Sequence, residues 1–366
     1  MNGIVNAMTR ENDVAAAPGR VNLIGEHIDY HGLPVLPIAL ERRVRVVYRP
    51  REDRRITAVS APYGVREFEW TDELAPVGAG DWENYLRAAA RVAAMFLPAS
   101  RTGIDAEISS DLPAAAGLSS SSALLVAFTL GLLRANGYNP GFEELMEVLP
   151  EGEQFVGTRG GGMDHAASLA SRAGCASLIG FHPITIRHIA IPPDWVFLVA
   201  NSMVRAEKSG AAREEYNARR NATMSAREKI SAGAPLAELE RETYRHVTTE
   251  AERVDAAVDA LEHDDAPAFG KLLLASHESL RDRLKVSCPA LDRLVEAAMD
   301  SGALGARLTG GGFGGCAVIL AKRPDLAAVR DGLIRRFYAG DGQHVFEAVA
   351  GPGALCPGTA LTEPST

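Results

Sequence analysis

Four consecutive serines, Ser119–Ser122, follow a run of small residues and come directly before a strongly apolar stretch. Small residues allow a backbone to approach a ligand closely, and the first turn of a helix offers unpaired N–H groups and the positive end of the helix dipole. A serine hydroxyl there can also bind a phosphate-associated Mg²⁺. The Gly-Lys-Ser/Thr ending of a Walker A loop is missing. The segment predicts a phosphate-binding loop; the alternative is a serine-rich cap on a buried helix.

Charged side chains gather in an earlier segment that ends at Tyr30. Arg20 can lie against a transferring phosphoryl group, where a fixed guanidinium offsets developing charge. Glu26 and Asp29 only accept hydrogen bonds when ionised, which suits the hydroxyl donors of a sugar, and His27 can donate or accept beside them. A surface turn with solvated charges explains the same residues equally well, so this segment alone does not decide.

A third candidate is Asp164, which follows the triple glycine Gly160–Gly162. Glycines permit close backbone approach, and this carboxylate would accept or orient the proton of an attacking hydroxyl. Its alternative role is a helix N-cap, because residues 166–173 have a helical pattern. The glycine-rich loop Thr309–Gly315 can line the phosphate site or permit a tight turn between domains, and we favour the packing role. A phosphate-binding loop, together with side chains that accept hydrogen bonds from hydroxyl groups, predicts a phosphotransferase that acts on a sugar.

Size and composition limit the alternatives. A chain of 366 residues suits about two domains, and its net charge of −9 argues against a nucleic-acid or acidic-membrane partner. The four cysteines form no CxxC pair, and neither they nor the remaining histidines have metal-ligand spacing. The first residues lack the basic-then-apolar order of a signal peptide, and no apolar run is long enough to cross a bilayer. We therefore expect a cytoplasmic protein.

The elements that must position these residues are mixed along the chain, which favours an α+β fold over a doubly wound sheet. In the first half we expect two strands and three helices, the last of which is interrupted near Pro150: Arg42–Arg49, Ile104–Ser109, Trp82–Leu97, Ala123–Ala135 and Glu143–Val156. In the second half we expect three strands and four helices: Trp195–Asn201, Ala317–Lys322, Val345–Val349, Ala251–Glu262, Ala268–Leu284, Pro289–Asp300 and Asp325–Tyr338.

Three further expectations concern the middle and the end of the chain. Prolines between Gly180 and Pro193 place the domain boundary there, giving domains 1–185 and 186–366. Arg213–Arg220 is most simply a solvated helix, although Tyr216 can stack on a ligand. The end of the chain, Glu363–Thr366, is expected to be disordered.

Three of these segments together resemble the motifs of the GHMP kinases. Gly19–Tyr30 resembles the galactokinase signature, Leu112–Ala123 the ATP loop, and Leu308–Cys316 the third motif of the superfamily. The stretches 215–220, 276–282 and 286–292 are also similar to galactokinases. The resemblance covers nearly the whole chain and implies two α+β lobes with the active site between them.

The resemblance also implies roles for individual residues. Asp164 would be the catalytic base, and Arg20 would stabilise the transferring phosphate and keep Asp164 ionised. The residues implied to hold the sugar are Glu26, His27, Asp29, Gly161 and Tyr216. The residues implied to bind ATP are Gly117, Leu118, Ser119, Ser120, Ser121 and Ser122, with Trp82 near the adenine. Ser121 and Glu153 would bind Mg²⁺, although the spacing of that glutamate varies among relatives.

The implied reaction is ATP-dependent phosphorylation of the anomeric hydroxyl of galactose. Gly160–Asp164 and other stretches resemble the N-acetylgalactosamine kinase branch, so that sugar is the alternative. His31, Leu33 and Pro34 depart from the usual galactokinase pattern and leave another monosaccharide open. A non-catalytic sugar and ATP sensor is a smaller possibility, because the serine loop, Arg20 and Asp164 are all present. Mevalonate is disfavoured, because several hydroxyl acceptors suit a sugar better. The oligomeric state, monomer or weak dimer, is left open.

Overall fold

The structure is a computed structural model that describes residues 13–113, 116–157, 160–205 and 211–356. The expected disordered tail at Glu363–Thr366 lies outside the described residues, as do Ala114 before the serine loop and Arg159 before the triple glycine. Within the described ranges, no helix is long and apolar enough to cross a membrane.

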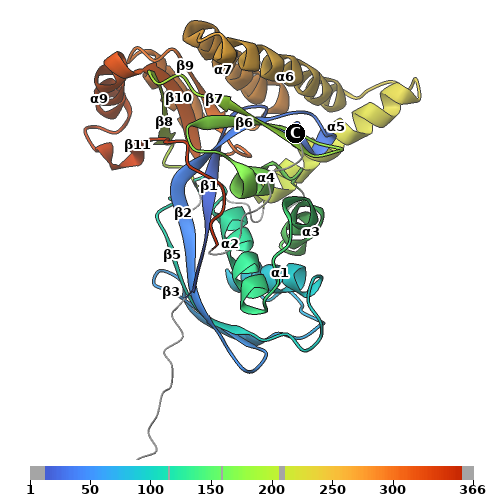
Figure 1. The fold of residues 1–366 in the computed structure, drawn as a ribbon. Helices are drawn as coiled ribbons and strands as arrows, with labels where there is room; N and C mark the ends of the chain where they lie inside the picture. The colour runs from blue at the N-terminus through green and yellow to red at the C-terminus, as the bar shows by residue number, and fades with distance from the viewer. Residues whose placement is uncertain (1–12, 114–115, 158–159, 206–210, 357–366) are drawn as a thin grey trace, which may run out of the picture.

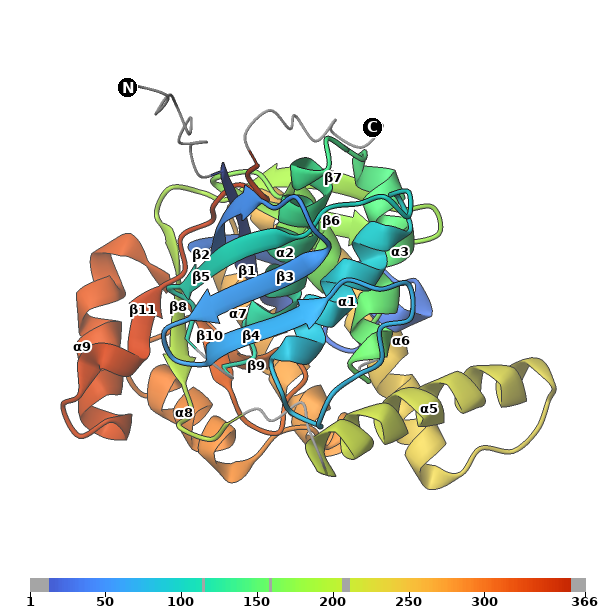
Figure 2. The same ribbon diagram turned by 90° about the horizontal axis from the view of Figure 1, so that it is seen from below.

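The first half of the chain builds a five-stranded sheet with the strand order β1-β2-β5-β3-β4 (Figure 2). Its strands are β1 (Asp13–Ile24), β2 (Leu36–Pro50), β3 (Arg55–Ser60), β4 (Gly64–Glu69) and β5 (Ile104–Ser110). Neighbours are antiparallel except β3 and β5, which are parallel. The two alternating segments expected as strands lie within β2 and β5, which confirms them. Strand β1, which carries Arg20, was not anticipated.

The described residues of this half form the α-helices α1 (Glu83–Ala94), α2 (Ser120–Ala135), α3 (Phe142–Phe155) and α4 (Met163–Ala170). Helix α2 packs on β1 and β2, and α1 packs on α2. Phe128 and Leu132 of α2 are fully buried, which confirms that a helix with apolar residues nearly all round lies in the core. It begins at Ser120 rather than Ala123, so the serines are part of its first turn.

Helix α3 runs without a break through Pro150, so the expected interruption there is wrong. A proline inside a helix removes one donor and crowds an earlier carbonyl, at a cost of about 3 kcal/mol. Leu145 and Leu149 are buried on the same helix, and burying two such side chains contributes about 3–6 kcal/mol. Packing therefore outweighs the proline, and the continuous helix carries Glu153 to the site described below.

The second half builds a four-stranded antiparallel sheet in the order β11-β8-β10-β9. Its strands are β8 (Trp195–Asn201), β9 (Gly305–Thr309), β10 (Cys316–Lys322) and β11 (Val345–Glu347). Helices α8 (Pro289–Met299) and α9 (Leu326–Phe337) contribute to the apolar cluster on one face. Helix α7 (Ala266–Ser279) approaches β9 so closely that a Cβ on Gly270 would lie 2.2 Å from the carbonyl oxygen of Leu304.

Helices α5 (Ala211–Ser231) and α6 (Glu238–Glu262) form a hairpin that projects from the body at the upper right of Figure 1. Helix α6 begins well before the expected start at Ala251. Glu240 accepts a hydrogen bond from the Ala237 N–H and closes the first turn. The buried face of the added turns carries His246 and Glu250, which are fully buried. The start of α6 was missed because several of its buried positions hold polar residues, so the segment has no clear apolar periodicity.

The two halves share one apolar core. A continuous cluster of buried residues includes Leu23 of β1, Phe128 of α2, Phe269 of α7 and Val318 of β10. Near the C-terminus, Leu355 bridges to Ala16 of β1. The hairpin of β6 (Cys175–Gly180) and β7 (Thr185–Ala190) spans the expected boundary after residue 185, and the division into two domains stays a prediction. The mixture of helices and sheets confirms the α+β class.

Candidate active site

The centre of the site is a pair formed by Arg20 of β1 and Asp164 of α4. The Arg20 Nε and Nη2 atoms each lie 2.7 Å from Asp164 Oδ1, and both side chains are largely buried. The N-cap position of α4 is occupied by Gly162, in a left-handed conformation with φ +103°. Asp164 lies in the first helical turn, so the alternative assignment of this residue as an N-cap is wrong. The turn instead presents its carboxylate to Arg20.

Arg20 also ties β1 to the loop before α2. Its Nη1 donates to the carbonyl oxygen of Gly117 at 2.8 Å, and its backbone N–H donates to that of Leu118 at 3.1 Å. Burial alone would lower the pKa of Arg20, but the charges of Asp164, Glu26 and Asp29 outweigh burial and raise it. Arg20 is therefore a fixed, fully charged cation among carboxylates.

The serine loop turns its hydroxyls toward carboxylates. The Ser119 Oγ donates to Asp164 Oδ2 at 2.5 Å, and the Ser122 Oγ donates to Glu153 Oε1 at 2.6 Å. Ser119 occupies the N-cap position of α2 in a left-handed conformation, with φ +57°, but its hydroxyl makes no cap hydrogen bond to the helix, unlike the serine cap considered as the alternative. The N-terminus of α2 nevertheless points at the Asp164 and Glu153 carboxylates. Ser120 and Ser121 are half-buried in the same turn.

The residues around Glu153 are suited to share a magnesium ion with phosphate oxygens. Within the described parts of the chain, no group of three His, Cys, Asp or Glu residues is arranged to hold a metal ion alone. Mg²⁺ is commonly bound by one or two carboxylates together with substrate phosphates. Glu153 is 9% exposed, and Ser121 and Ser122 lie in the helix turn next to it. This all-oxygen donor set fits Mg²⁺.

Asp29 lies on the other side of Asp164, in a short 3₁₀ helix, Asp29–His31. Its Oδ2 accepts a hydrogen bond from the Gly161 N–H at 3.0 Å. A Cβ on Gly161 would lie 2.3 Å from the Tyr30 nitrogen, so only glycine allows this approach. Burial, followed by the charge of Asp164, raises the pKa of Asp29 to about 6. The two carboxylates are therefore close enough to influence each other's ionisation.

His27 and Tyr216 form an aromatic wall beside these carboxylates. Their ring centroids are 5.0 Å apart. Burial lowers the pKa of His27 to about 3, so the ring is neutral. Its Nε2 lies 3.2 Å from the Gly311 carbonyl oxygen and its Nδ1 lies 3.3 Å from the Tyr30 hydroxyl. Because a carbonyl only accepts, Nε2 carries the proton and Nδ1 accepts from Tyr30.

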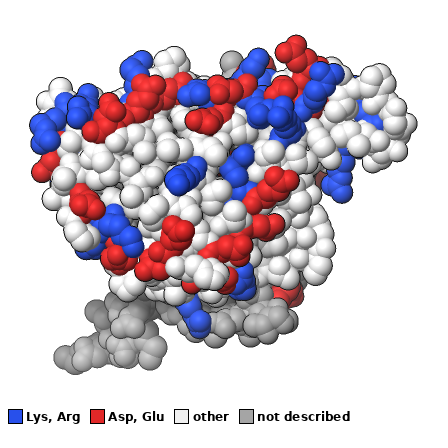
Figure 3. All heavy atoms as spheres, turned by 90° about the horizontal axis from the view of Figure 1, so that it is seen from above, with Lys and Arg blue, Asp and Glu red and all other residues white. Residues whose placement is uncertain are grey.

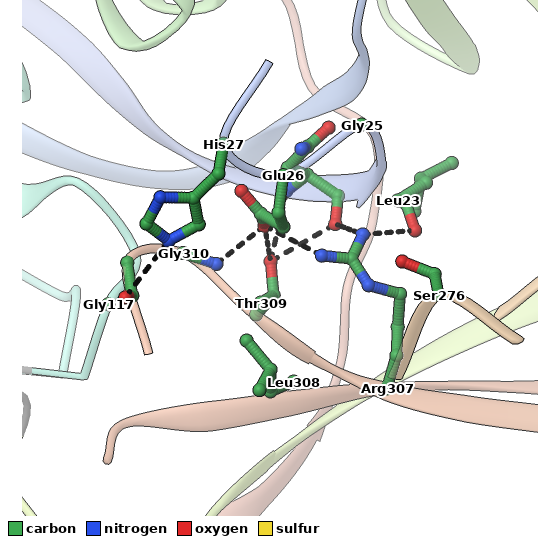
Figure 4. A network of polar contacts seen from close by, with 12 residues as sticks. Leu23, Gly25, Glu26, His27, Gly117, Ser276, Arg307, Leu308, Thr309 and Gly310 are labelled. Carbon is green, nitrogen blue, oxygen red and sulfur yellow. Dashed lines mark hydrogen bonds and ion pairs between the residues drawn. The ribbon is translucent and has the colours of Figure 1, made fainter. Parts of the chain in front are cut away.

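Glu26 faces the third glycine loop. Its Oε1 accepts from the Gly310 N–H at 2.6 Å, lies 3.0 Å from Arg307 Nη2, and lies 3.3 Å from the Thr309 hydroxyl (Figure 4). A Cβ on Gly310 would lie 2.7 Å from the Gly117 carbonyl oxygen, so the third loop packs directly on the loop before α2. Both roles considered for the third loop are compatible with this contact, and the packing role stays a prediction.

The structure thus brings together most of the residues singled out from the sequence, with the Arg20–Asp164 pair in contact with Gly117, Ser119 and Ser122. Trp82 is placed differently, at the start of α1. Its indole N–H donates to the Tyr63 carbonyl oxygen at 3.1 Å and the Arg66 guanidinium lies over its ring. These described contacts are with the β3–β4 side of the sheet, and a role for Trp82 near adenine stays a prediction.

Sequence reasoning missed several residues that hold the site. Tyr30 orients His27, and Arg307 pairs with Glu26 from the interior of β9. A signal for Arg307 was present, because a charged residue in a short apolar strand is rarely buried without a partner. Glu250 and His246 of α6, which contact the turn before His27, gave no such signal within their charged helical sequence.

Comparison with known proteins places this geometry in a family. The galactokinase galactose-binding signature matches residues 6–50, the N-terminal domain of the GHMP kinases matches residues 84–172, and the C-terminal region of the GHMP kinases matches residues 257–340. A galactokinase from Roseiflexus is 35% identical, with 90% of this chain and 88% of that protein covered. The human galactokinase is 35% identical, with 84% of this chain and 83% of that protein covered.

Solved structures agree with these matches. The galactokinase of Lactococcus lactis, crystallised with galactose, superposes with a TM-score of 0.86 at 26% identity and covers 95% of each chain. A mevalonate kinase from Methanococcus jannaschii shares the fold, with a TM-score of 0.70, at 19% identity over 93% of this chain and 99% of that one. The chain belongs to the galactokinase family, within the GHMP kinases.

Proposed function

We propose that this chain transfers the γ-phosphoryl group of ATP to the anomeric hydroxyl of galactose, giving galactose 1-phosphate and ADP. As a galactokinase-family member the chain is an ATP-dependent sugar kinase. The observation that carries the assignment of roles is the position of the Arg20–Asp164 pair. It lies between the helix N-terminus at Ser119–Ser122 and the Asp29–Gly161 contact.

Asp164 is proposed as the catalytic base. Oδ1 is held by Arg20, and Oδ2 accepts from Ser119. When the sugar is bound, Asp164 is proposed to accept the proton of the anomeric hydroxyl. As the proton moves to Asp164, the sugar oxygen attacks the γ-phosphorus and the bond to the β-phosphate oxygen breaks. The Arg20 guanidinium is placed to stabilise charge on the transferring group.

The N-terminus of α2 is proposed to hold the ATP phosphates. Its unpaired first-turn N–H groups and the positive end of its dipole attract anions. Ser121 and Glu153 would hold Mg²⁺, which when bound neutralises phosphate charge. Ser122 orients the Glu153 carboxylate through the 2.6 Å hydrogen bond. In this arrangement the chain's own contribution is mainly positioning and charge stabilisation.

Glu26, His27 and Asp29 are proposed to contact the sugar hydroxyls, with Gly161 and Tyr216 completing the pocket. Asp29 offers an anionic acceptor, and the neutral His27 ring offers a surface beside Tyr216. Because one Glu26 oxygen is committed to Gly310 and Arg307, its contact with sugar would be made by Oε2. On the face seen in Figure 3, acidic and basic side chains are interspersed.

The test is coupled ADP release from the wild-type protein with a panel of sugars. We expect galactose to be turned over best, and mannose and mevalonate to give nothing. Faster turnover of N-acetylgalactosamine than of galactose would change the proposed substrate to N-acetylgalactosamine, while the proposed reaction type would stand. Sugar binding with no ADP release would overturn the kinase assignment in favour of a sensor.

A further inference from the structure

Buried polar side chains from the second half of the chain form hydrogen bonds with the turn that carries the proposed sugar-binding residues Glu26 and His27. This turn, Gly25–His27, follows β1, and Gly25 and His27 both have left-handed backbones with φ +101° and +62°. Figure 4 shows the turn enclosed by side chains from β9 and by Ser276 of α7. A strained turn of this kind persists only when its surroundings hold it in place.

Glu250 of α6 is the main contact to the backbone of this turn. It is fully buried, and its Oε1 accepts from the Gly25 N–H at 3.0 Å and from the Ser276 hydroxyl at 2.6 Å. Its Oε2 accepts from Arg253 at 2.7 Å. Burial would raise the pKa of Glu250, but the charges of Arg253 and Arg307 and the Ser276 hydrogen bond lower it below its usual range. The carboxylate is therefore a permanent acceptor for Gly25.

His246 lies one helical turn before Glu250 on α6. It contacts Glu26, the residue after Gly25. Its Nε2 lies 3.0 Å from the Glu26 carbonyl oxygen, and its Nδ1 lies 2.9 Å from the Ser279 hydroxyl. Burial lowers the pKa of His246. A neutral ring facing a carbonyl must donate from Nε2, so Nδ1 accepts from Ser279. Two neighbouring turns of α6 thus fix both the N–H of Gly25 and the carbonyl of Glu26.

We propose that Glu250 and His246 are positioning residues for the sugar, through the Gly25–His27 turn whose last residue is His27. This inference rests on the proposed function, because it assigns the turn to the sugar site. Neither residue belongs to the phosphate loop, so their loss should impair galactose binding more than ATP binding. A purely structural role would lower stability without separating the two substrates.

The test compares Glu250→Leu with Glu250→Gln in the full-length protein. Leucine keeps the side chain's volume but leaves the Gly25 N–H without an acceptor, whereas glutamine keeps one acceptor oxygen. A buried donor that loses its acceptor destabilises the conformation that buries it. For Glu250→Leu we expect the KM for galactose to rise about tenfold or more, with little change in the KM for ATP. Glu250→Gln should rescue most of that loss.

Glu240→Leu is a matched control on the same helix. Glu240 also accepts from a backbone N–H, a serine hydroxyl and a basic side chain, which belong to Ala237, Ser225 and Lys229. It does so at the far end of α6, away from the turn. We expect Glu240→Leu to lower the melting temperature while leaving both KM values near those of the wild type.

Hydrogen exchange provides a readout that does not depend on turnover. Backbone amides of residues 25–27 should exchange faster in Glu250→Leu and His246→Leu than in the wild type and in Glu240→Leu. If Glu250→Leu does not fold, Ser276→Ala removes one donor to Oε1 and should raise the KM for galactose about threefold. Equal changes in both KM values, or unchanged exchange at the turn, would overturn the positioning role. Absence of galactose turnover in the wild type would instead overturn the proposed function.

Discussion

The substitution Asp164→Asn removes the proposed base while keeping the shape of the side chain. An asparagine can place its carbonyl oxygen where Oδ1 accepts from Arg20 at 2.7 Å. Its amide then takes the place of Oδ2, and the Ser119 hydroxyl can rotate and accept instead of donating. The geometry is conserved, but the side chain can no longer take a proton from the sugar.

The expected loss follows from the proton transfer that disappears. A positioned general base contributes about 10²–10⁴-fold to the rate, which corresponds to about 3–5 kcal/mol in activation free energy. We expect kcat to fall by this factor with little change in the KM for galactose, because Asp29 and His27 are untouched. Arg20 keeps its 2.8 Å hydrogen bond to the Gly117 carbonyl oxygen and the nearby charges of Asp29 and Glu26, so the protein should still fold.

Coupled ADP release measures the rate, and calorimetry of galactose binding measures the affinity without turnover. Asp194→Asn is a suitable control, because it removes a carboxylate from an ion pair outside the site. Asp194 pairs with Lys322 at 2.8 Å, next to the Trp195–Lys322 end of the β8–β10 ladder. The other end of that ladder is the Asn201–Cys316 pair. It should retain wild-type kinetics. A folded Asp164→Asn protein that keeps more than about a tenth of the wild-type kcat would refute the assignment of this residue as the base.

Three further predictions concern the other groups of the site. Gly161→Ala places a methyl group 2.3 Å from the Tyr30 nitrogen and should raise the KM for galactose about tenfold or more. Gly78→Ala is the control, because a Cβ there meets nothing within 4 Å, and it should leave this KM unchanged. Because the pKa of Asp29 is raised to about 6, lowering the pH through that value protonates an acceptor. The KM for galactose should therefore rise below about pH 6, and a pH profile of Asp29→Asn that keeps this inflection would show that another group causes it. Glu153→Gln should raise the Mg²⁺ concentration for half-maximal activity about tenfold or more, with activity restored at higher Mg²⁺; an unchanged Mg²⁺ titration would remove Glu153 from the metal site.

The motif-bearing loops could be predicted from the sequence, because each needs particular residue types over a short span. The triple glycine before Asp164 predicted a close backbone approach, and in the structure Gly161 contacts Asp29. Helix α2 was found from its apolar residues, since burial follows directly from composition. The resemblance to galactokinases, from which the sugar and ATP were inferred, rested on the same short segments. The comparisons confirm that resemblance.

Contacts between distant segments could not be predicted in this way. The sequence predicted the serines as a phosphate cradle, but it gave no sign that Ser119 donates to Asp164 or that Ser122 donates to Glu153. These contacts depend on where α4 and α3 meet α2, which is decided by packing. Pro150 misled for the same reason, because two buried leucines hold a helix that local propensity would break.

Buried polar residues were the hardest to predict. His246 and Glu250 lie among charged residues of α6, where a solvated face is the ordinary interpretation. Most of the partners that explain their burial belong to other segments, among them Gly25 and Glu26, which lie far away in the sequence. Hydrogen bonds and neighbouring charges offset the cost of removing such groups from water, and no pattern within one helix reveals those partners.

The most direct measurement of the central claim is identification of the product that the wild-type protein makes from ATP and galactose. Phosphorus NMR of the reaction mixture should show a sugar phosphate whose phosphorus couples to the anomeric proton, formed in equal amount with ADP. A folded protein that releases no ADP with galactose, or a product that carries its phosphate on another carbon, would contradict the account.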